Sequence, residues 1–340
     1  AAVDDVIFGC VSQVGEQSFH IGRNAVLAAG LPVTVPAVSI DRQCGSSQQA
    51  IHFAAQAVMS GTQDMVIAAG VESMTRVPMG SPTRLAEEAG LGSPWSPAIR
   101  QRFGVDGFSQ FTGAQMIADK YGLSRDTMDR FALSSHRKAT SAITAGAFDT
   151  ELLPVPVEGG LHDRDEGVRP DSSLEALAGL KTLTPTGSLT AGNASQMCDG
   201  AAAVLVVGEK ALKDHGLTPL ARIHTMTVVA GDPVIMLEEP IPGTARALKR
   251  AGLSIHDIDL FEINEAFASV VLAWQQATGA DPARVNVNGG GIALGHPLGA
   301  TGAKLMSTLV HTLRARKARY GLQAMCEGGG IANVTIVEAL

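Results

Sequence analysis

The chain has 340 residues, of which 45% are hydrophobic and 17% are charged. This composition can bury a large core and is unlike that of a disordered chain. At this length we expect two packed units, or one core with a large insertion. The net charge of -7, with no block of Lys and Arg, argues against nucleic acid as a partner.

No apolar run approaches the roughly 18 residues that cross a bilayer, and no signal-peptide pattern opens the chain. We therefore expect a soluble, cytoplasmic protein with no membrane contact. Cys10, Cys44, Cys198 and Cys326 are the four cysteines, and they lack the C-x-x-C spacing of metal and redox pairs. We expect no metal site and reduced thiols. Taken alone, each cysteine is most simply a small buried hydrophobe.

The first part of the chain alternates strand and helix patterns. Apolar strand patterns occur at residues 6–8 and 33–40, and the spacing of apolar residues over 51–59 is that of a helix with one buried face. Residues 65–69 form a further strand pattern, which completes a βαβ unit. The sequence therefore predicts a parallel sheet here.

Between residues 73 and 189 the regular alternation of strand and helix patterns is lost. Eight prolines and a charged patch at 162–169 interrupt this region, which we interpret as an insertion. One clear helix is predicted over residues 124–144, because Ser124 is a good cap and an acidic residue follows in the first turn.

Strands and helices alternate again in the second half. Residues 200–207 are consistent with a helix start or a strand, and strand patterns recur at 258–263, at 285–287 and near 325 and 334–337. Helix stripes occur over 267–274 and 305–313. In each half a glycine-rich turn with a reactive residue precedes an apolar helix, and these residues are Cys44 and His296. The pattern fits two α/β halves that face each other.

Cys44 lies where an expected strand leads into an expected helix. The first N–H groups and the dipole of a helix stabilise a thiolate at that position. Gly45, Ser46 and Ser47 follow, and their small side chains leave room for a bulky acyl thioester. Cys44 is therefore a candidate nucleophile.

A nucleophilic thiol needs a base, and His296 lies in a glycine-dense turn, residues 289–302. Two other interpretations stay open on this segment alone. The turn could cradle a phosphate, although it spells neither G-x-G-x-x-G nor G-x-x-x-x-G-K-[ST]. His296 could also be a capping or core residue.

Two further strand ends carry polar groups. Asn264 follows a buried strand, where an amide can orient a water or donate to an oxyanion. Cys326 ends another strand, and the glycines 328–330 after it offer N–H groups that can form an oxyanion hole.

Together these segments resemble the thiolase family. The matching motifs are Cys44-Gly45-Ser46, Asn264-Glu265-Ala266-Phe267, His296-Pro297-Leu298-Gly299-Ala300-Thr301-Gly302 and Cys326-Glu327-Gly328-Gly329-Gly330. Weaker matches at residues 70–74 and 190–195 extend the resemblance along nearly the whole chain.

The resemblance implies a fold of two similar α/β halves packed as αβαβα layers with an inserted loop domain. Residues 1–72 and 190–219 would form the N-terminal half, 73–189 the insertion, and 220–340 the C-terminal half. A strand and helix that precede residue 3 in thiolases are expected to be missing from this chain.

The resemblance also implies the chemistry. His296 would deprotonate Cys44, which becomes acylated, and Cys326 would be the acid/base at the α-carbon. One oxyanion hole would use His296 and a water held by Asn264, and the other the backbone N–H groups of Cys44 and Gly328. The substrates implied are 3-ketoacyl-CoA, acetyl-CoA and coenzyme A, with no permanently bound cofactor.

Ser195 matches a family position that contacts pantetheine, and Arg169 is a candidate for the nucleotide end of coenzyme A. The resemblance favours a homodimer or homotetramer. The local run 108–113 lacks the Met-Gly pair of many thiolases, and with the Gln-rich Cys44 turn it resembles actinobacterial β-oxidation thiolases, including those for sterol side chains.

Three alternatives remain. A biosynthetic acetoacetyl-CoA thiolase would carry the same motifs. A β-ketoacyl synthase would need a second His in place of the Asn264 or Cys326 segment, and the sequence has none there. A non-catalytic thiolase-like protein that binds acyl-CoA or lipid would not need all four motifs.

Overall fold

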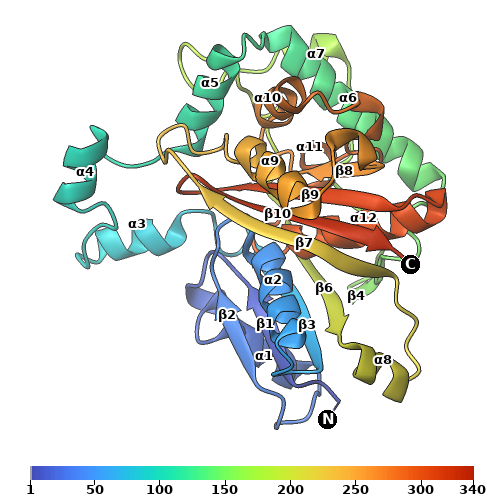
Figure 1. Cartoon of the computed structure of the whole chain (residues 1–340). Coiled ribbons are helices and arrows are strands. Elements are labelled where there is room, and N and C mark those ends of the chain that lie inside the picture. The colour runs from blue at the N-terminus through green and yellow to red at the C-terminus, as the bar shows by residue number, and fades with distance from the viewer. Residues whose placement is uncertain (1) are drawn as a thin grey trace.

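Two four-stranded sheets form the core of the computed structural model, which describes residues 2–340 (Figure 1). The first sheet has the order β2-β1-β3-β6, and the second has the order β7-β10-β9-β8. Their strands are β1 (Asp5–Gly9), β2 (Ala37–Ile40), β3 (Met65–Ser73), β6 (Asp199–Val207), β7 (Ala221–Ala230), β8 (Leu260–Ile263), β9 (Tyr320–Glu327) and β10 (Ile331–Ala339).

The parallel pairing predicted for the first part of the chain is confirmed. β1 lies between β2 and β3 and runs parallel to both. The whole sheet is mixed, however, because β6 pairs antiparallel with β3. Residues 200–207, for which helix and strand were both open, therefore form a strand.

Helices α2 (Ser46–Met59) and α12 (Thr301–Arg316) lie between the two sheets and contact each other. β1 shows how the layers are divided. Val6 packs with Val26 of α1 (Ile21–Ala28), whereas Ile7 belongs to the cluster that includes Ile51 of α2 and Leu309 of α12. Alternate side chains of one strand thus face an outer and a central layer.

Helices α9 (Pro240–Ala251) and α10 (Ala268–Thr278) lie beside the second sheet, on the side away from α2 (Figure 1). The buried Trp274 of α10 packs edge-on against Phe261 of β8, with ring centroids 5.3 Å apart. The resulting order of layers is αβαβα.

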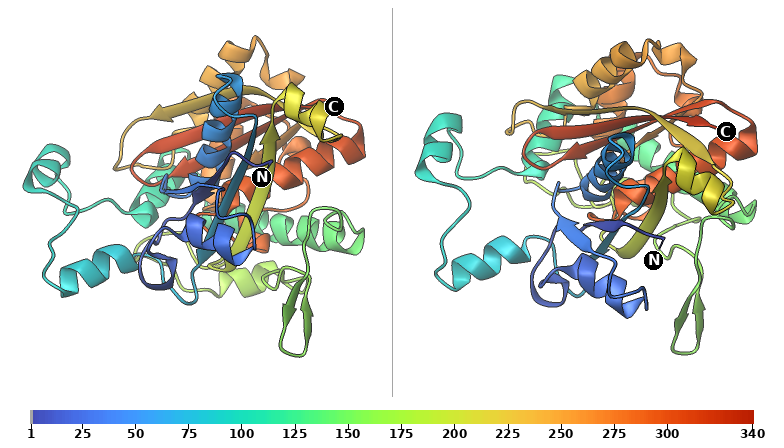
Figure 2. Two further views of the ribbon diagram at one scale, coloured as in Figure 1. Left: turned by 90° about the horizontal axis from the view of Figure 1, so that it is seen from below. Right: turned by 60° about the horizontal axis from the view of Figure 1, so that its bottom comes forward.

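The region between β3 and β6, which we interpret as an insertion, contributes helices and a hairpin. These are α3 (Ser81–Glu88), α4 (Pro97–Phe103), α5 (Gln110–Lys120), α6 (Arg125–Thr144), α7 (Leu174–Ala178), β4 (Val155–Val157) and β5 (Gly160–His162). α5 and α6 pack on α10, whereas α3 and α4 extend from the body as an arm and the β4–β5 hairpin projects from it (Figure 2). No helix within residues 2–340 is long and apolar enough to cross a membrane.

The helix predicted over 124–144 is confirmed, with Ser124 as its cap, but the strand predicted over 285–287 is wrong. Val285 forms only an isolated bridge with Phe261. Asn286 has a φ of 45°, and its side chain bonds the N–H and the C=O of Ile263 at 2.8 Å each. The Asn286 side chain thus takes the place of backbone hydrogen bonds to β8, so residues 285–287 do not form a strand. The remaining short helices are α8 (Glu209–Asp214) and α11 (Gly291–Leu294).

The first turns of α2 and α12 touch at Gly302. A Cβ on Gly302 would lie 2.1 Å from the backbone nitrogen of Gln48, so only glycine allows this approach. The N–H of Ala303 donates to Ser47 Oγ at 2.9 Å beside it. The residues that precede the two helices are therefore held close to each other.

We expect Gly302→Ala to lower the free energy of unfolding by about 2 kcal/mol, because the added methyl forces two packed helices apart. Urea denaturation measures this difference. Gly179→Ala is the matched control, since a Cβ there meets nothing closer than 3.6 Å and its φ of −73° suits alanine. Equal stabilities for the two variants would contradict the packing argument.

Candidate active site

Cys44 lies in the short turn between β2 and α2. Gln43 before it has a φ of 48°, a conformation that few non-glycine residues adopt, and its N–H donates to Asp41 Oδ1 at 2.6 Å. Cys44 is only 8% exposed, and burial raises the pKa of its thiol well above the ordinary value. Negative charge on Cys326 or Glu327, when either group ionises, raises this pKa further. The resting thiol is therefore protonated and needs a base.

His296 is buried and has a defined tautomer. The Thr301 hydroxyl donates to the carbonyl of Pro297 at 2.9 Å, so its oxygen accepts the Nδ1–H of His296 at 2.6 Å. The Nε2 atom then carries the lone pair, and Asn264 Nδ2 lies 3.4 Å from it. The hydrogen-bond pattern leaves Nε2 as the atom that can take a proton.

The imidazole of His296 is neutral. Burial, with a smaller contribution from the Lys304 cation, lowers its pKa to about 3. Lys304 is held by the carbonyls of Leu294 and Gly295 at 2.8 and 3.1 Å, at the start of the turn that carries His296. The same lysine thus fixes the turn and keeps the histidine in its basic form.

Asn264 links His296 to Cys326. It follows β8, where its N–H donates to Ala324 on β9 at 3.0 Å. A hydrogen bond from its side chain to the Cys326 thiol opposes the burial that raises the pKa of Cys326 to about 12. Within residues 2–340 its Oδ1 is buried and has no hydrogen-bond partner. This oxygen is available to a ligand or a water.

The end of β9 lies against the Cys44 turn. A Cβ on Gly328 would be 2.8 Å from Gln43 Oε1, which places the backbone of Gly328 beside this turn. Cys44 also shares one buried cluster with Met325, which precedes Cys326, and with Leu298, which lies two residues after His296. Met74 and Leu305 are the other buried members of this cluster. The structure thus brings the buried Cys44, His296, Asn264 and Cys326 and the half-buried Gly328 into one region.

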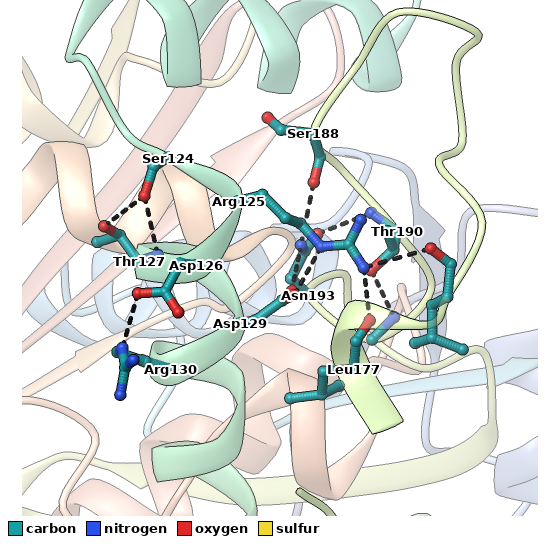
Figure 3. A network of polar contacts seen from close by, with 12 residues as sticks. Ser124, Arg125, Asp126, Thr127, Asp129, Arg130, Leu177, Ser188, Thr190 and Asn193 are labelled. Carbon is teal, nitrogen blue, oxygen red and sulfur yellow. Dashed lines mark hydrogen bonds and ion pairs between the residues drawn. The ribbon is translucent and has the colours of Figure 1, made fainter. Parts of the chain in front are cut away.

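Ser195 borders this region. Its N–H donates to Ala266 at 2.9 Å, and the next residue, Gln196, accepts from the N–H of His296 at 3.0 Å. The segment is anchored by the fully buried Asn193, which donates to Asp129 at 2.8 Å (Figure 3). Arg125 pairs with the same carboxylate at 2.6 Å. Ser195 therefore lies on a rigid segment next to the His296 turn.

Arg169 is exposed, and its backbone N–H donates to His136 Nδ1 at 3.1 Å. Its segment also reaches the His296 turn, since Gln196 Nε2 donates to the carbonyls of Gly167 and Ile292 at 2.7 Å each. The backbone position of Arg169 is thus defined, and its side chain faces solvent.

Sequence reasoning missed several residues that hold the site. Glu72 is fully buried and accepts from the N–H groups of Val11, Ser12 and Gly299 at 2.9–3.0 Å. It therefore ties the first sheet to the His296 turn. Glu265 plays a similar part, as it accepts from Ile292 N and Ser135 Oγ. Glu72 lies near the end of β3, and Glu265 follows β8. A carboxylate at the end of a buried strand is the sequence feature that could have identified them.

Within residues 2–340 no group of three or more His, Cys, Asp and Glu side chains could hold a metal ion. The groups that can act on a substrate here are two thiols, an imidazole, an amide and backbone N–H groups. A thiol with a neutral imidazole nearby and a second thiol at a separate strand end is suited to covalent transfer of an acyl group.

Comparison with known proteins identifies the family. The model described as "Thiolase, N-terminal domain" matches residues 1–210, and "Thiolase, C-terminal domain" matches residues 217–339. The chain belongs to the thiolase family. It is therefore an acyltransferase. The family that the sequence motifs indicated is confirmed.

Two relatives show how close the similarity is. The chain is 55% identical over 342 residues to the steroid 3-ketoacyl-CoA thiolase FadA6 of Mycobacterium tuberculosis, covering 100% of this chain and 84% of that protein. It is 41% identical over 348 residues to a 3-ketoacyl-CoA thiolase of Enterobacter sp., covering 99% and 87%. The resemblance to actinobacterial thiolases is thus confirmed.

Solved structures confirm the layered fold. The human mitochondrial 3-ketoacyl-CoA thiolase in complex with CoA has a TM-score of 0.88 at 37% identity, over 100% of this chain and 87% of that one. The Bacillus anthracis acetyl-CoA acetyltransferase has the same TM-score at 36% identity, over 100% and 88%.

Thr301→Val should slow turnover of this thiolase by about 10- to 100-fold, because Nδ1–H loses its acceptor and Nε2 is no longer held as the basic nitrogen. The measurement is the CoA-dependent loss of 3-ketoacyl absorbance, with KM little changed. Thr308→Val is the control, since its hydroxyl bonds Glu151 farther along the same helix. Normal turnover of Thr301→Val would contradict the tautomer assignment.

Proposed function

We propose that this thiolase cleaves 3-ketoacyl-CoA with coenzyme A, giving acetyl-CoA and a shortened acyl-CoA through an acyl group on Cys44. One observation carries the proposal, namely the chain of buried contacts that runs from His296 through Asn264 to Cys326, beside the Cys44 turn. The relatives named as 3-ketoacyl-CoA thiolases support the degradative direction.

Acylation begins when His296 Nε2 takes the proton of Cys44. The thiolate attacks the 3-keto carbon, and the bond between C2 and C3 breaks, so the acyl group stays on Cys44 and an acetyl-CoA enolate leaves. Cys326 gives its proton to the enolate carbon and becomes the thiolate. Two thiols are required because one is already acylated when the other acts.

Deacylation reverses the proton movements. The Cys326 thiolate takes the proton of incoming coenzyme A, whose sulfur attacks the thioester on Cys44. The acyl group leaves as acyl-CoA, and His296 returns its proton to Cys44. Both cysteines and the histidine thus regain their starting protonation states.

Two oxyanion sites fit these steps. A protonated His296 and a water held by the unpartnered Oδ1 or the amide of Asn264 would stabilise one negative oxygen. The backbone N–H groups of Cys44 and Gly328 would stabilise the other, and the contact of Gly328 with the Cys44 turn supports that role. We also propose that Ser195 contacts the pantetheine arm and that Arg169 reaches the nucleotide end of coenzyme A.

The substrate's acyl group is proposed from the similarity to relatives. The 55% identity to a protein named as a steroid thiolase supports a bulky ring-bearing acyl chain. Synthesis of acetoacetyl-CoA is the second candidate, and the equally similar fold of an acetyl-CoA acetyltransferase favours it. A buried active site suits both, because exclusion of water protects the thioester from hydrolysis.

We further propose a homodimer or homotetramer that works in the cytoplasm. Val155, Val157 and Leu161 are exposed on the projecting β4–β5 hairpin, which supports contact with another copy, since a lone two-stranded hairpin is marginal in water. The free cysteines among the described residues fit a reducing compartment. Light scattering on a sizing column measures the number of copies.

We expect thiolysis of a series of 3-ketoacyl-CoAs, from acetoacetyl-CoA to sterol-like compounds, with the highest kcat/KM for bulky acyl chains. The loss of 3-ketoacyl absorbance with free coenzyme A measures each rate. A preference for acetoacetyl-CoA would favour the biosynthetic candidate instead. No turnover of any member by the intact protein would contradict the thiolase proposal.

Acetyl-CoA alone should acetylate Cys44 in the wild type and in Cys326→Ala, whereas Cys44→Ser should stay unmodified, as intact and peptide mass spectrometry report. Cys326→Ala should nevertheless lose thiolysis by about a hundredfold or more, because no other group protonates the enolate carbon. An adduct on Cys326 alone, or normal turnover of Cys326→Ala, would overturn the two roles.

A further inference from the structure

Glu327 is a buried carboxyl group to which the mechanism above gives no part. It follows Cys326 at the end of β9 and has no exposed surface. Within residues 2–340 neither of its carboxyl oxygens forms a well-aligned hydrogen bond, and the backbone N–H of Asn333 makes only a weaker contact. Glu72 and Glu265, the buried carboxylates that anchor the site, each accept at least two hydrogen bonds. Glu327 is therefore not a structural anchor of that kind.

The carboxyl group of Glu327 lies against the nucleophile turn. A Cβ on Gly45 would be 1.8 Å from Glu327 Oε1 and 2.5 Å from its Cδ, so the carboxyl group packs on the residue that follows Cys44. Only a glycine leaves space for it. Glu327 is also the direct neighbour of Cys326 in the chain. One carboxyl group thus packs on the residue after Cys44 and ends the strand that carries Cys326, close enough for its charge to act on both thiols.

Few charged groups face Glu327. Arg42 and Asp41 face it from the turn before Cys44, and the backbone of Asn333 faces it from β10. Burial, with a smaller contribution from Asp41, raises the pKa of Glu327 to about 8 although Arg42 and the backbone of Asn333 act to lower it. The group is therefore neutral below about pH 8 and negative above it.

The sign of the effect on the thiols follows from charge. A negative Glu327 raises the pKa of Cys44 and of Cys326, because an anion disfavours a second anion nearby. A neutral Glu327 has no such effect. The thiolates thus form most easily while Glu327 keeps its proton.

We propose that Glu327 is a positioning residue for both thiols: as a neutral acid it leaves Cys44 and Cys326 free to ionise, and as a carboxylate it suppresses both thiolates. The consequence for turnover rests on the proposed thiolase function. The consequence for the reactivity of the thiols does not.

The direct test is alkylation of Cys44 by iodoacetamide between about pH 6.5 and about pH 9.5, read by peptide mass spectrometry. The ratio of the Glu327→Gln rate to the wild-type rate should increase about tenfold over this range, since a thiol pKa raised by about one unit leaves about tenfold less thiolate. Glu151→Gln is the matched control. Glu151 is another largely buried carboxyl, with a pKa raised by burial to about 7, and it bonds Thr308 rather than a thiol. A ratio that stays constant with pH would overturn the proposal.

A second variant, Arg42→Gln, tests the effect of the Glu327 charge on the pH dependence of thiolysis. It can be measured even if Glu327→Gln does not fold. Arg42 favours the Glu327 carboxylate, so Arg42→Gln should move the alkaline loss of thiolysis to higher pH. The proposal would be contradicted if the alkaline decrease of the thiolysis rate in Arg42→Gln occurred at the same pH as in the wild type, or at a lower pH. If the wild type shows no thiolysis but the alkylation ratio still increases, the function proposed above fails and the role of Glu327 stands.

Discussion

The N-terminal ends of α2 and α12 meet at Gly302, where the backbone of Gln48 leaves no space for a side chain. Cys44 precedes one of these helices and His296 precedes the other, so this contact decides where the proposed nucleophile and the proposed base lie. The His296 turn is also pressed onto the first sheet, since a Cβ on Gly70 would lie 2.1 Å from the carbonyl of Gly299. Close backbone packing thus defines the site more than any single polar bond does.

Burial has two opposite effects on this site. It raises the pKa of both reactive thiols and lowers that of His296, so the resting groups are all neutral. A neutral thiol and a neutral imidazole lose less on desolvation than an ion pair would. Charge then develops only during the reaction, where the Asn264 amide and backbone N–H groups can stabilise it. Lys304 lowers the pKa of His296, and a negative Glu327 raises the pKa of both thiols.

Much of the architecture could be predicted because its signals are local. The apolar spacing over α2 and the Ser124 cap of α6 depend on neighbours within a few residues. The strand expected at residues 285–287 was wrong because Asn286 bonds β8 with its side chain, an interaction with a residue 23 positions away. The mixed sheet was missed for a similar reason, since the direction of β6 depends on the long insertion before it.

The sequence by itself determined the family and pointed to the proposed site residues, because the motifs around Cys44, Asn264, His296 and Cys326 are short and contiguous. Only the tertiary structure decided the tautomer of His296, the buried anchor Glu72 and the position of Glu327 against Gly45. These features join segments that lie far apart in the chain. Their pKa values and hydrogen bonds depend on burial and on neighbours from other elements, which no local pattern encodes.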